Sequence, residues 1–155
     1  MEALTPSKQL AIAYSVAAKV FESTEDKQGE PYIHHCIAVK DYLCTKDKEL
    51  QAIAILHDVV EDTPTESFPS KITMPMMFGW GFSERVVTAV WCLTHNSTET
   101  YEDYIKRVAL NEDAKLVKLA DLQHNLEVTR IKGNLNAAHF ARVERYHKAF
   151  VYLNC

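Results

Sequence analysis

Apolar residues recur at intervals of three and four along nearly the whole chain, which is the spacing of one face of an α-helix. We find no convincing pairs of strands and no internal repeat. The pattern predicts an all-α bundle of roughly seven or eight helices. The expected helices cover about 6–23, Tyr32 to near Cys44, Asp47 to just before Thr63, a segment opening at Ser83, and about 99–111, 113–131 and 136–153.

Several helix starts carry capping residues. Thr5 and Pro6 suit the positions before and at the first helical turn, and Asp47 and Ser83 each precede an apolar periodic segment. The stretch from Thr65 to Gly81 has a weaker pattern, because prolines interrupt it, and we expect only short helical pieces there. The aromatic run MFGWGF that ends this stretch is either an interface or core.

Composition narrows the function classes. The chain has 155 residues, 47% hydrophobic and 25% charged, which predicts one folded domain over 1–155. A net charge of −4 gives no basic surface for nucleic acid, so a polyanionic ligand would need a local basic pocket or a metal. No apolar run is long enough to cross a bilayer. The start lacks a signal peptide and the cysteines lack paired spacing, so we expect a cytoplasmic protein with reduced thiols at Cys36, Cys44, Cys92 and Cys155.

The stretch IAILHDVVEDT at 53–63 places four polar groups directly after an apolar run. On a continuous helix His57 would lie above Glu61, and Asp58 above Asp62, on adjoining stripes of one face. A solvated helix end or a capping cluster is the common alternative for a His-Asp pair. The apolar run before it favours a buried helix whose polar end opens into the interior or a cleft.

A metal site would need donors from other segments as well, because one helix offers only a few adjacent ligands. Two candidates stand out: His34 and His35 precede an apolar helix, and Asp121 interrupts the apolar run KLVKLADLQHNL. A single residue of this kind is more often a hydrogen-bonded core residue. Several together favour a metal site.

With these motifs the sequence resembles the HD-domain metal-dependent phosphohydrolases, and more narrowly the branch that hydrolyses the alarmone ppGpp. The matching motifs are GEPYIHH at 29–35, AILHDVVEDT at 54–63, FG at 78–79, LT at 93–94, and YEDYIKRVALNEDAKLVKLADLQHN at 101–125. They span most of the chain in the order of the family. The resemblance implies an HD-domain helical bundle and removal of the 3′-pyrophosphate from ppGpp-like nucleotides.

The resemblance also implies a role for individual residues. The metal, usually manganese in this branch, would lower the pKa of a bound water, while Glu61 and Asp62 position that water and handle its proton. Lys27 and Asn125 are expected to contact the nucleotide, and His34 fills a variable position. The implied metal ligands are His35, His57, Asp58 and Asp121.

Two departures from the family concern the substrate. Asp26 and Glu127 stand where the family commonly has arginines that hold the nucleotide, and carboxylates there would repel its phosphates. Candidates to compensate are Lys27, Lys118, Arg107 and Arg130. Two alternatives therefore stay open: a phosphohydrolase acting on another nucleotide or small phosphoester, and a module that binds a nucleotide or protein without turnover.

The remaining histidines and two tyrosines are assigned to the scaffold. Tyr101 and Tyr104 are expected in the core, with an aromatic wall for a base as the alternative. His124 is nearest to the predicted site, where it either lines the site or has a surface or supporting role. The other three, His95, His139 and His147, are expected to be structural or at the surface. The sequence does not determine the oligomeric state.

Overall fold

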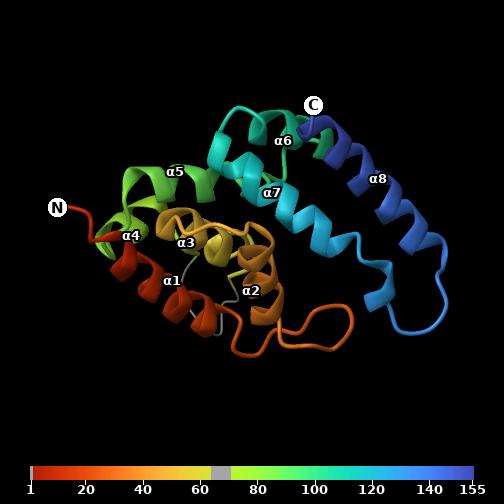
Figure 1. Ribbon diagram of the computed structural model, residues 1–155, viewed down its shortest axis with the longest axis horizontal. Helices are drawn as coiled ribbons and strands as arrows, with labels where there is room; N and C mark the ends of the chain where they lie inside the picture. The colour runs from red at the N-terminus through yellow and green to blue at the C-terminus, as the bar shows by residue number, and fades with distance from the viewer. Residues whose placement is uncertain (1, 64–70) are drawn as a thin grey trace.

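The computed structural model describes residues 2–63 and 71–155, and within these ranges the fold is a bundle of eight α-helices with one short 3₁₀ turn (Figure 1). The only β-pairing in the described ranges is an isolated bridge between Glu25 and Pro31. The all-α prediction is confirmed. The helices are α1 (Pro6–Val20), α2 (Ile33–Tyr42), α3 (Lys48–Leu56), α4 (Met74–Gly79), α5 (Glu84–Cys92), α6 (Tyr101–Val108), α7 (Glu112–Asn125), the 3₁₀ turn η1 (Val128–Arg130) and α8 (Ala137–Leu153).

Local sequence determines where most of these helices begin. The Asp47 carboxylate accepts hydrogen bonds from the backbone N–H groups of Glu49 and Leu50, and the Ser83 hydroxyl accepts one from Val86. The caps predicted at Asp47 and Ser83 are therefore confirmed, and each satisfies donors that an uncapped helix would leave unpaired. Thr5 stands at the N-cap of α1 as predicted, but its side chain forms no capping hydrogen bond. The prediction for 65–81 is borne out by the short α4, while residues 64–70 lie outside the described part of the chain.

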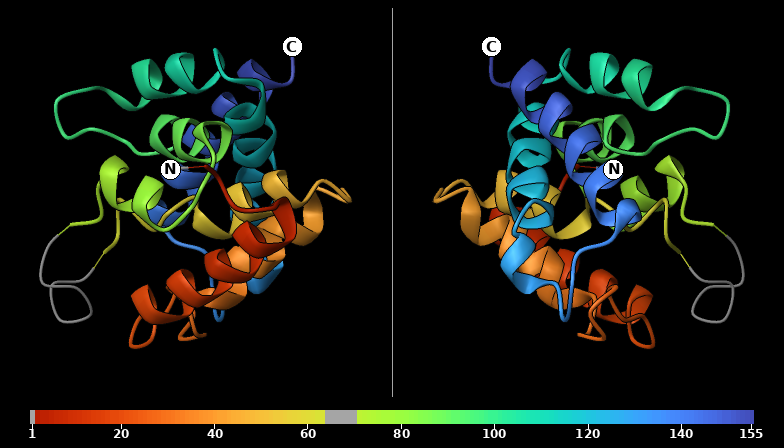
Figure 2. Two further views of the ribbon diagram at one scale, coloured as in Figure 1. Left: turned by 90° about the vertical axis from the view of Figure 1, so that its left-hand side faces the viewer. Right: turned by 90° about the vertical axis from the view of Figure 1, so that its right-hand side faces the viewer.

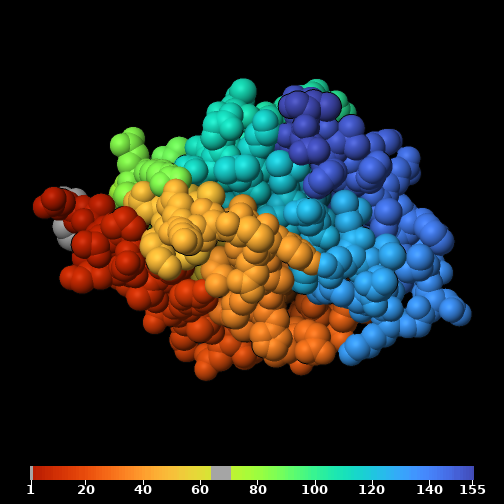
Figure 3. Space-filling model, in the orientation of Figure 1, coloured from red at the N-terminus to blue at the C-terminus, as the bar shows by residue number. Residues whose placement is uncertain are grey.

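Helix α3 is the centre of the fold. It packs against α1, α2, α5 and α7, and its residues 52–56 are fully buried on every side. Helix α8 lies at the edge of the bundle against α7 and α6, and the right-hand view of Figure 2 shows it running across the molecule to the C-terminus. The surfaces of α2 and α7 meet in the middle of the face shown in Figure 3. The residues after α3 are thus enclosed by α2 and α7.

The predicted MFGWGF segment is mostly core. Met77 and Phe82 are buried, whereas Phe78 has 41% of its surface accessible. None of the described helices is long and apolar enough to span a membrane.

The burial of α3 gives a stability prediction. Ile53→Ala is expected to lower the free energy of unfolding by about 2–5 kcal/mol, because Ile53 is fully buried and the shorter side chain leaves a cavity in the core around α3. Denaturant unfolding followed by circular dichroism measures this change. The control is Leu110→Ala, whose side chain is 87% exposed and whose loss should cost no more than about 0.5 kcal/mol. Equal effects of the two substitutions would contradict the assignment of α3 as the central core helix.

Candidate metal centre and substrate cleft

The HD dipeptide lies just beyond the end of a helix, not within one. The prediction of a continuous helix through residue 62 is wrong: α3 ends at Leu56, and the following residues form turns. The His57 ring donates a hydrogen bond from Nδ1 to the Ala54 carbonyl at 2.7 Å, and Val59 N–H bonds to the Leu56 carbonyl at 2.9 Å, three residues back. Successive side chains on an ideal helix diverge by about 100°. His57 Nε2 and Asp58 Oδ2 nevertheless lie 2.9 Å apart.

Three elements bring four donor side chains together. His35 lies in the first turn of α2, Asp121 in the last turns of α7, and His57 and Asp58 follow α3. Their donor atoms all lie within 4.8 Å of one another. His35 Nε2 is 3.0 Å from Asp121 Oδ1 and 3.8 Å from Asp58 Oδ2, while His57 Nε2 is 3.5 Å from Asp121 Oδ1. His34, next in sequence, points to the exposed surface.

This cluster fits a divalent metal. Donor atoms about 2.1 Å from one ion lie roughly 3–4 Å apart, which is the spacing observed here. His57 Nε2 is buried and forms no hydrogen bond, and the bond from Nδ1 leaves its Nε2 lone pair free to bind an ion. Two imidazoles and two carboxylates suit first-row divalent metals. His35, His57, Asp58 and Asp121 are thus the residues that could hold it.

The charge balance within the cluster is anionic. Burial alone would lower the pKa of the His57 imidazole, but the carboxylates of Asp58 and Asp121 raise it well above its ordinary value. Burial likewise opposes ionisation of Asp121, yet the Lys118 ammonium and the two imidazoles hold its pKa well below the usual range. Both carboxylates are therefore charged, and they attract a cation.

Neighbouring groups orient the donor carboxylates. The Tyr32 hydroxyl donates to Asp58 Oδ2 at 2.5 Å. Lys118 Nζ donates to Asp121 Oδ2 at 2.8 Å, and the Asn125 amide donates to Asp121 Oδ1 at 2.7 Å. Asn125, which the sequence predicts to contact a nucleotide, also lines the cleft, but one N–H of its amide is already bonded to Asp121. Such partners fix the geometry of metal ligands.

Glu61 and Asp62 reach the same site from its solvent side. Both carboxylates are exposed and line the cleft, which agrees with the expectation that this polar segment opens into the interior or a cleft. Glu61 Oε1 accepts a hydrogen bond of 2.6 Å from the His95 backbone N–H, so His95 supports the site from the loop after α5. Partial desolvation, together with the charges of Asp58 and Glu61, raises the pKa of Asp62 to about 7. A bound cation would lower that value.

A cleft of about 480 Å³ opens over the cluster. Lys27, the predicted substrate contact, lines it, and so do Arg142 and Arg145 on α8. The sequence analysis missed both arginines, although their spacing of three residues places them on one helix face. Burial and then the charges of the two arginines lower the pKa of Lys27, so the three cations face one another. They form no ion pair with any side chain in the described part of the chain, and we call Lys27, Arg142 and Arg145 the basic arm.

The other candidate cations are paired with groups of the protein itself. Lys118 pairs with Asp121, and Arg107 is held by Glu99 and by the carbonyls of Cys92 and Thr94, away from the cleft. Arg130 lines the cleft and pairs with Asp26 at 3.0 Å, so the aspartate that stands in place of a family arginine is neutralised. Glu127 lines the cleft with its charge uncompensated by an ion pair among the described residues.

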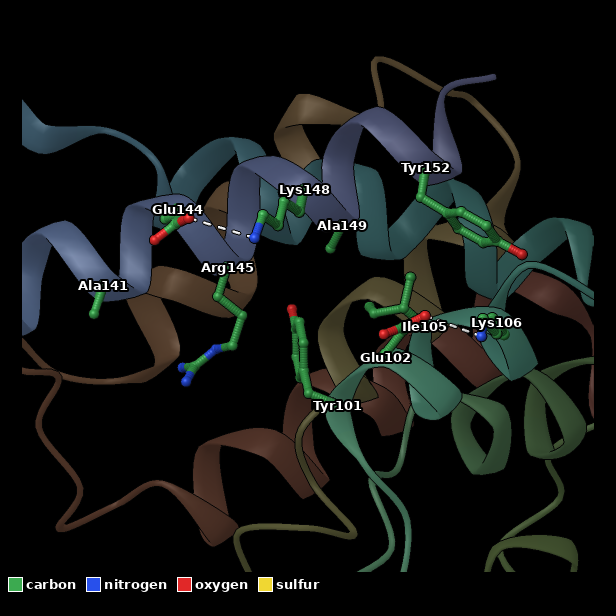
Figure 4. Close-up of a pocket in the computed structure, with 10 residues that line it drawn as sticks. All are labelled: Tyr101, Glu102, Ile105, Lys106, Ala141, Glu144, Arg145, Lys148, Ala149 and Tyr152. Atoms are coloured by element: carbon green, nitrogen blue, oxygen red, sulfur yellow. Dashed lines mark ion pairs between the residues drawn. The ribbon is translucent and has the colours of Figure 1, made fainter.

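The two tyrosines differ in burial, since Tyr104 lies in the core and Tyr101 is half-buried. Tyr104 is buried and donates its hydroxyl to the Leu93 carbonyl at 2.7 Å, yet Tyr101 and Tyr104 also line the cleft. Figure 4 shows a second concavity, a groove of about 540 Å³ between α6 and α8. Tyr101 and Arg145 line both hollows and separate them, with the guanidinium carbon 5.2 Å from the ring centroid. The groove holds no metal-binding cluster among the described residues, and two of its lysines pair with glutamates of the groove.

Known proteins are similar to this chain in sequence and in fold. No family model matches the chain. The bifunctional (p)ppGpp synthase/hydrolase SpoT of Escherichia coli (strain K12) is 34% identical over 147 residues, which cover 89% of this chain and 20% of that protein. A GTP pyrophosphokinase of Myxococcus xanthus is 30% identical over 122 residues, covering 74% of this chain and 16% of that protein. The chain thus spans about a fifth of the length of the curated relatives it matches.

A solved structure supports the same relationship. It is described as a metazoan ortholog of SpoT that hydrolyses ppGpp, and it superimposes with a TM-score of 0.74 and 25% identity over 97% of this chain and 88% of that one. The likeness therefore extends over the whole bundle and not over the HD motif alone. The chain belongs to the SpoT-like family of HD-domain proteins that includes the ppGpp hydrolases.

Proposed function

We propose that this chain is a phosphohydrolase that uses a divalent metal, most readily Mn²⁺, to remove the 3′-pyrophosphate of ppGpp-like guanosine nucleotides. The observation that carries the proposal is the joining of a four-donor cluster with a basic arm in one cleft. The relatives named for ppGpp hydrolysis support this substrate class. The name of the Myxococcus relative refers to synthesis, so the names alone do not decide the reaction.

Different residues of the cleft would have different roles in the reaction. His35, His57, Asp58 and Asp121 would hold the metal, which supplies Lewis-acid activation of water and phosphate when bound. Asp62 accepts the proton of the attacking water, and Glu61, anchored on His95, orients that water. The basic arm neutralises the phosphate charges, which carbonyls and carboxylates elsewhere in the cleft cannot do. Tyr101 offers an aromatic surface to the base.

The departures at 26 and 127 bear differently on this substrate. Asp26 is paired with Arg130 and adds no net negative charge to the cleft. Glu127 does add one, and this observation favours the second candidate, a phosphohydrolase for a less highly charged nucleotide or phosphoester. Because the basic arm brings three cations that form no ion pair among the described residues, we place ppGpp first.

The deciding experiment measures pyrophosphate released from ppGpp by the purified protein with Mn²⁺, beside a panel of nucleotides and small phosphoesters. Turnover of ppGpp that stops on chelation and returns with added Mn²⁺ is expected. Metal-dependent release only from another member of the panel would replace the substrate and keep the chemistry. Metal binding without any turnover would overturn the enzyme assignment in favour of a binding module.

The basic arm gives a separate prediction. Arg142→Gln is expected to raise KM for ppGpp by about 10- to 100-fold with kcat nearly unchanged, because it removes a charge-assisted contact of about 1.5–3 kcal/mol to phosphate groups. Steady-state kinetics at saturating Mn²⁺ measures it. The matched control is Lys148→Gln on the same helix, since Lys148 is 77% exposed and pairs with Glu144 outside the cleft. A loss in kcat alone, or an equal effect of the control, would contradict this role.

A further inference from the structure

A chain of polar contacts leads from the surface of the cleft to the donor histidine His35. The Asp26 carboxylate accepts a hydrogen bond from Arg130 Nη2 at 3.0 Å. Arg130 Nη1 lies 3.0 Å from the His124 carbonyl and 3.2 Å from His124 Nδ1. His124 Nδ1 in turn lies 2.7 Å from His35 Nδ1. The two rings have centroids 4.9 Å apart and planes inclined by 29°, so they meet edge to edge through these nitrogens.

For neutral imidazole rings, the form that binds a metal, the donors and acceptors in this chain allow only one arrangement of protons. A guanidinium can only donate, so the two hydrogens of Arg130 Nη1 serve the carbonyl and the ring nitrogen of His124. His124 Nδ1 must therefore be an unprotonated acceptor. The proton between the two Nδ1 atoms then belongs to His35, and His35 Nε2 keeps its lone pair. That lone pair faces Asp121 and Asp58, in the donor cluster.

The opposite arrangement leaves like groups in contact. If His35 carried its proton on Nε2, His124 would have to donate from Nδ1, and that N–H would face the N–H of Arg130 at 3.2 Å. Both groups are donors, so this contact would be repulsive. His124 is buried, with 8% of its surface accessible, so water cannot readily take the place of the lost bond.

We propose that Arg130 and His124 are positioning residues that hold His35 in the one tautomer able to bind a metal through Nε2, with Asp26 anchoring Arg130. This inference rests on the metal site of the proposed function. It gives the departure at position 26 a physical reason. The Asp26 carboxylate is itself held by the backbone N–H groups of Gln28 and Glu30, at 2.8 and 3.0 Å, so the anchor is rigid.

The anchor also joins distant parts of the chain. Asp26 lies in the loop before α2, and Arg130 lies in η1 after α7, 104 residues later. Because α2 carries His35 and α7 carries Asp121, the ion pair ties together the two helices that supply donors to the cluster. For His57 the equivalent role falls to the Ala54 carbonyl, a fixed acceptor on its own helix. The two imidazoles are thus oriented by a local contact in one case and by a long-range chain in the other.

Metal affinity tests the proposal without any substrate. Titration calorimetry with Mn²⁺ is expected to show about 10- to 100-fold weaker binding for His124→Leu, the size of loss typical when a partner of a ligand histidine is removed. His124→Asn, whose side-chain oxygen can occupy the place of Nδ1 as an acceptor, should recover most of the affinity. Arg130→Met, at a partly exposed position, should show a smaller loss in the same direction. Lys132→Met is the control, because its side chain is 73% exposed and does not contact His124.

The tautomer itself provides a second readout. In the Zn²⁺-loaded protein, nitrogen-15 spectra of the imidazoles should show His35 with metal on Nε2 and a proton on Nδ1, and His124 with a bare Nδ1. Metal on His35 Nδ1, or wild-type Mn²⁺ affinity in His124→Leu, would overturn the inference. A wild-type protein that binds no divalent metal would overturn it together with the metal site. Failure of ppGpp turnover in a protein that meets both expectations would overturn only the substrate.

Discussion

Asp58→Asn is expected to weaken Mn²⁺ binding by more than about 100-fold and to lower ppGpp hydrolysis at least as much, since loss of a mere partner of a ligand already costs 10- to 100-fold. The substitution keeps the shape of the side chain and its acceptor for the Tyr32 hydroxyl, which lies 2.5 Å away. It removes one of two negative charges in the cluster. Hard divalent ions prefer carboxylates to neutral amides, so affinity falls while the fold persists.

A weaker substitution and a matched control test this prediction further. Tyr32→Phe removes only the hydrogen bond to Asp58, and its loss of Mn²⁺ affinity should be smaller than that of Asp58→Asn. Asp41→Asn is the matched control, because Asp41 is 64% exposed and pairs with Lys40. Calorimetry gives the affinities, and thermal unfolding without metal confirms that all variants fold. Wild-type affinity in Asp58→Asn would exclude Asp58 as a ligand.

Residue types along the chain marked His34, His35, His57, Asp58 and Asp121 as candidate donors, and the choice of four ligands among them rested on the resemblance to the HD-domain family. His35, Asp58 and Asp121 each stand beside long apolar runs, and polar groups in such places need partners or a cation. Periodicity was enough for α5, α6 and α8, whose faces are amphipathic, but the helix predicted over 113–131 ends at Asn125. The structure brings these donors within 4.8 Å because α2 and α7 both pack against α3.

The end of α3 could not be predicted in the same way. The pattern of apolar residues continues through Val59 and Val60, both of which are buried, so periodicity alone extends the helix. The helix stops because the His57 ring takes the Ala54 carbonyl, a side-chain contact that competes with the helical hydrogen bond.

The partners of the candidate arginines could not be predicted from the sequence for a different reason. Whether Arg130 or Arg107 faces the cleft depends on packing between segments far apart in the chain, and neither position has a distinctive local pattern. Arg107 turns to the carbonyls at the end of α5, and Arg130 turns to Asp26. The basic arm could not be predicted either, because Arg142 and Arg145 reach the cleft only through the way α8 packs over it. The amphipathic pattern of that helix does not show this packing.

The carboxylates beside the cluster carry the second large prediction. Asp62→Asn is expected to lower kcat by about 10²- to 10⁴-fold with Mn²⁺ affinity close to that of the wild type, because it removes a proton acceptor and no ligand. The Asp62 backbone N–H bonds to the Asp58 carbonyl at 3.0 Å, which keeps this carboxylate next to the cluster. No hydrogen bond to its side chain forms among the described residues, so both oxygens are free to meet a water.

Glu61→Gln should have a smaller effect on kcat. An amide oxygen can still accept the hydrogen bond from the His95 backbone, so the side chain keeps its place and loses only its charge. Single-turnover kinetics at saturating Mn²⁺ isolates the chemical step, and calorimetry on the same samples reports metal affinity. If Asp62→Asn lost metal as Asp58→Asn does, Asp62 would be a ligand. If it kept both metal and kcat, the proton would leave by another route, and Glu61, held 2.6 Å from the His95 N–H, would be the remaining carboxylate to accept it.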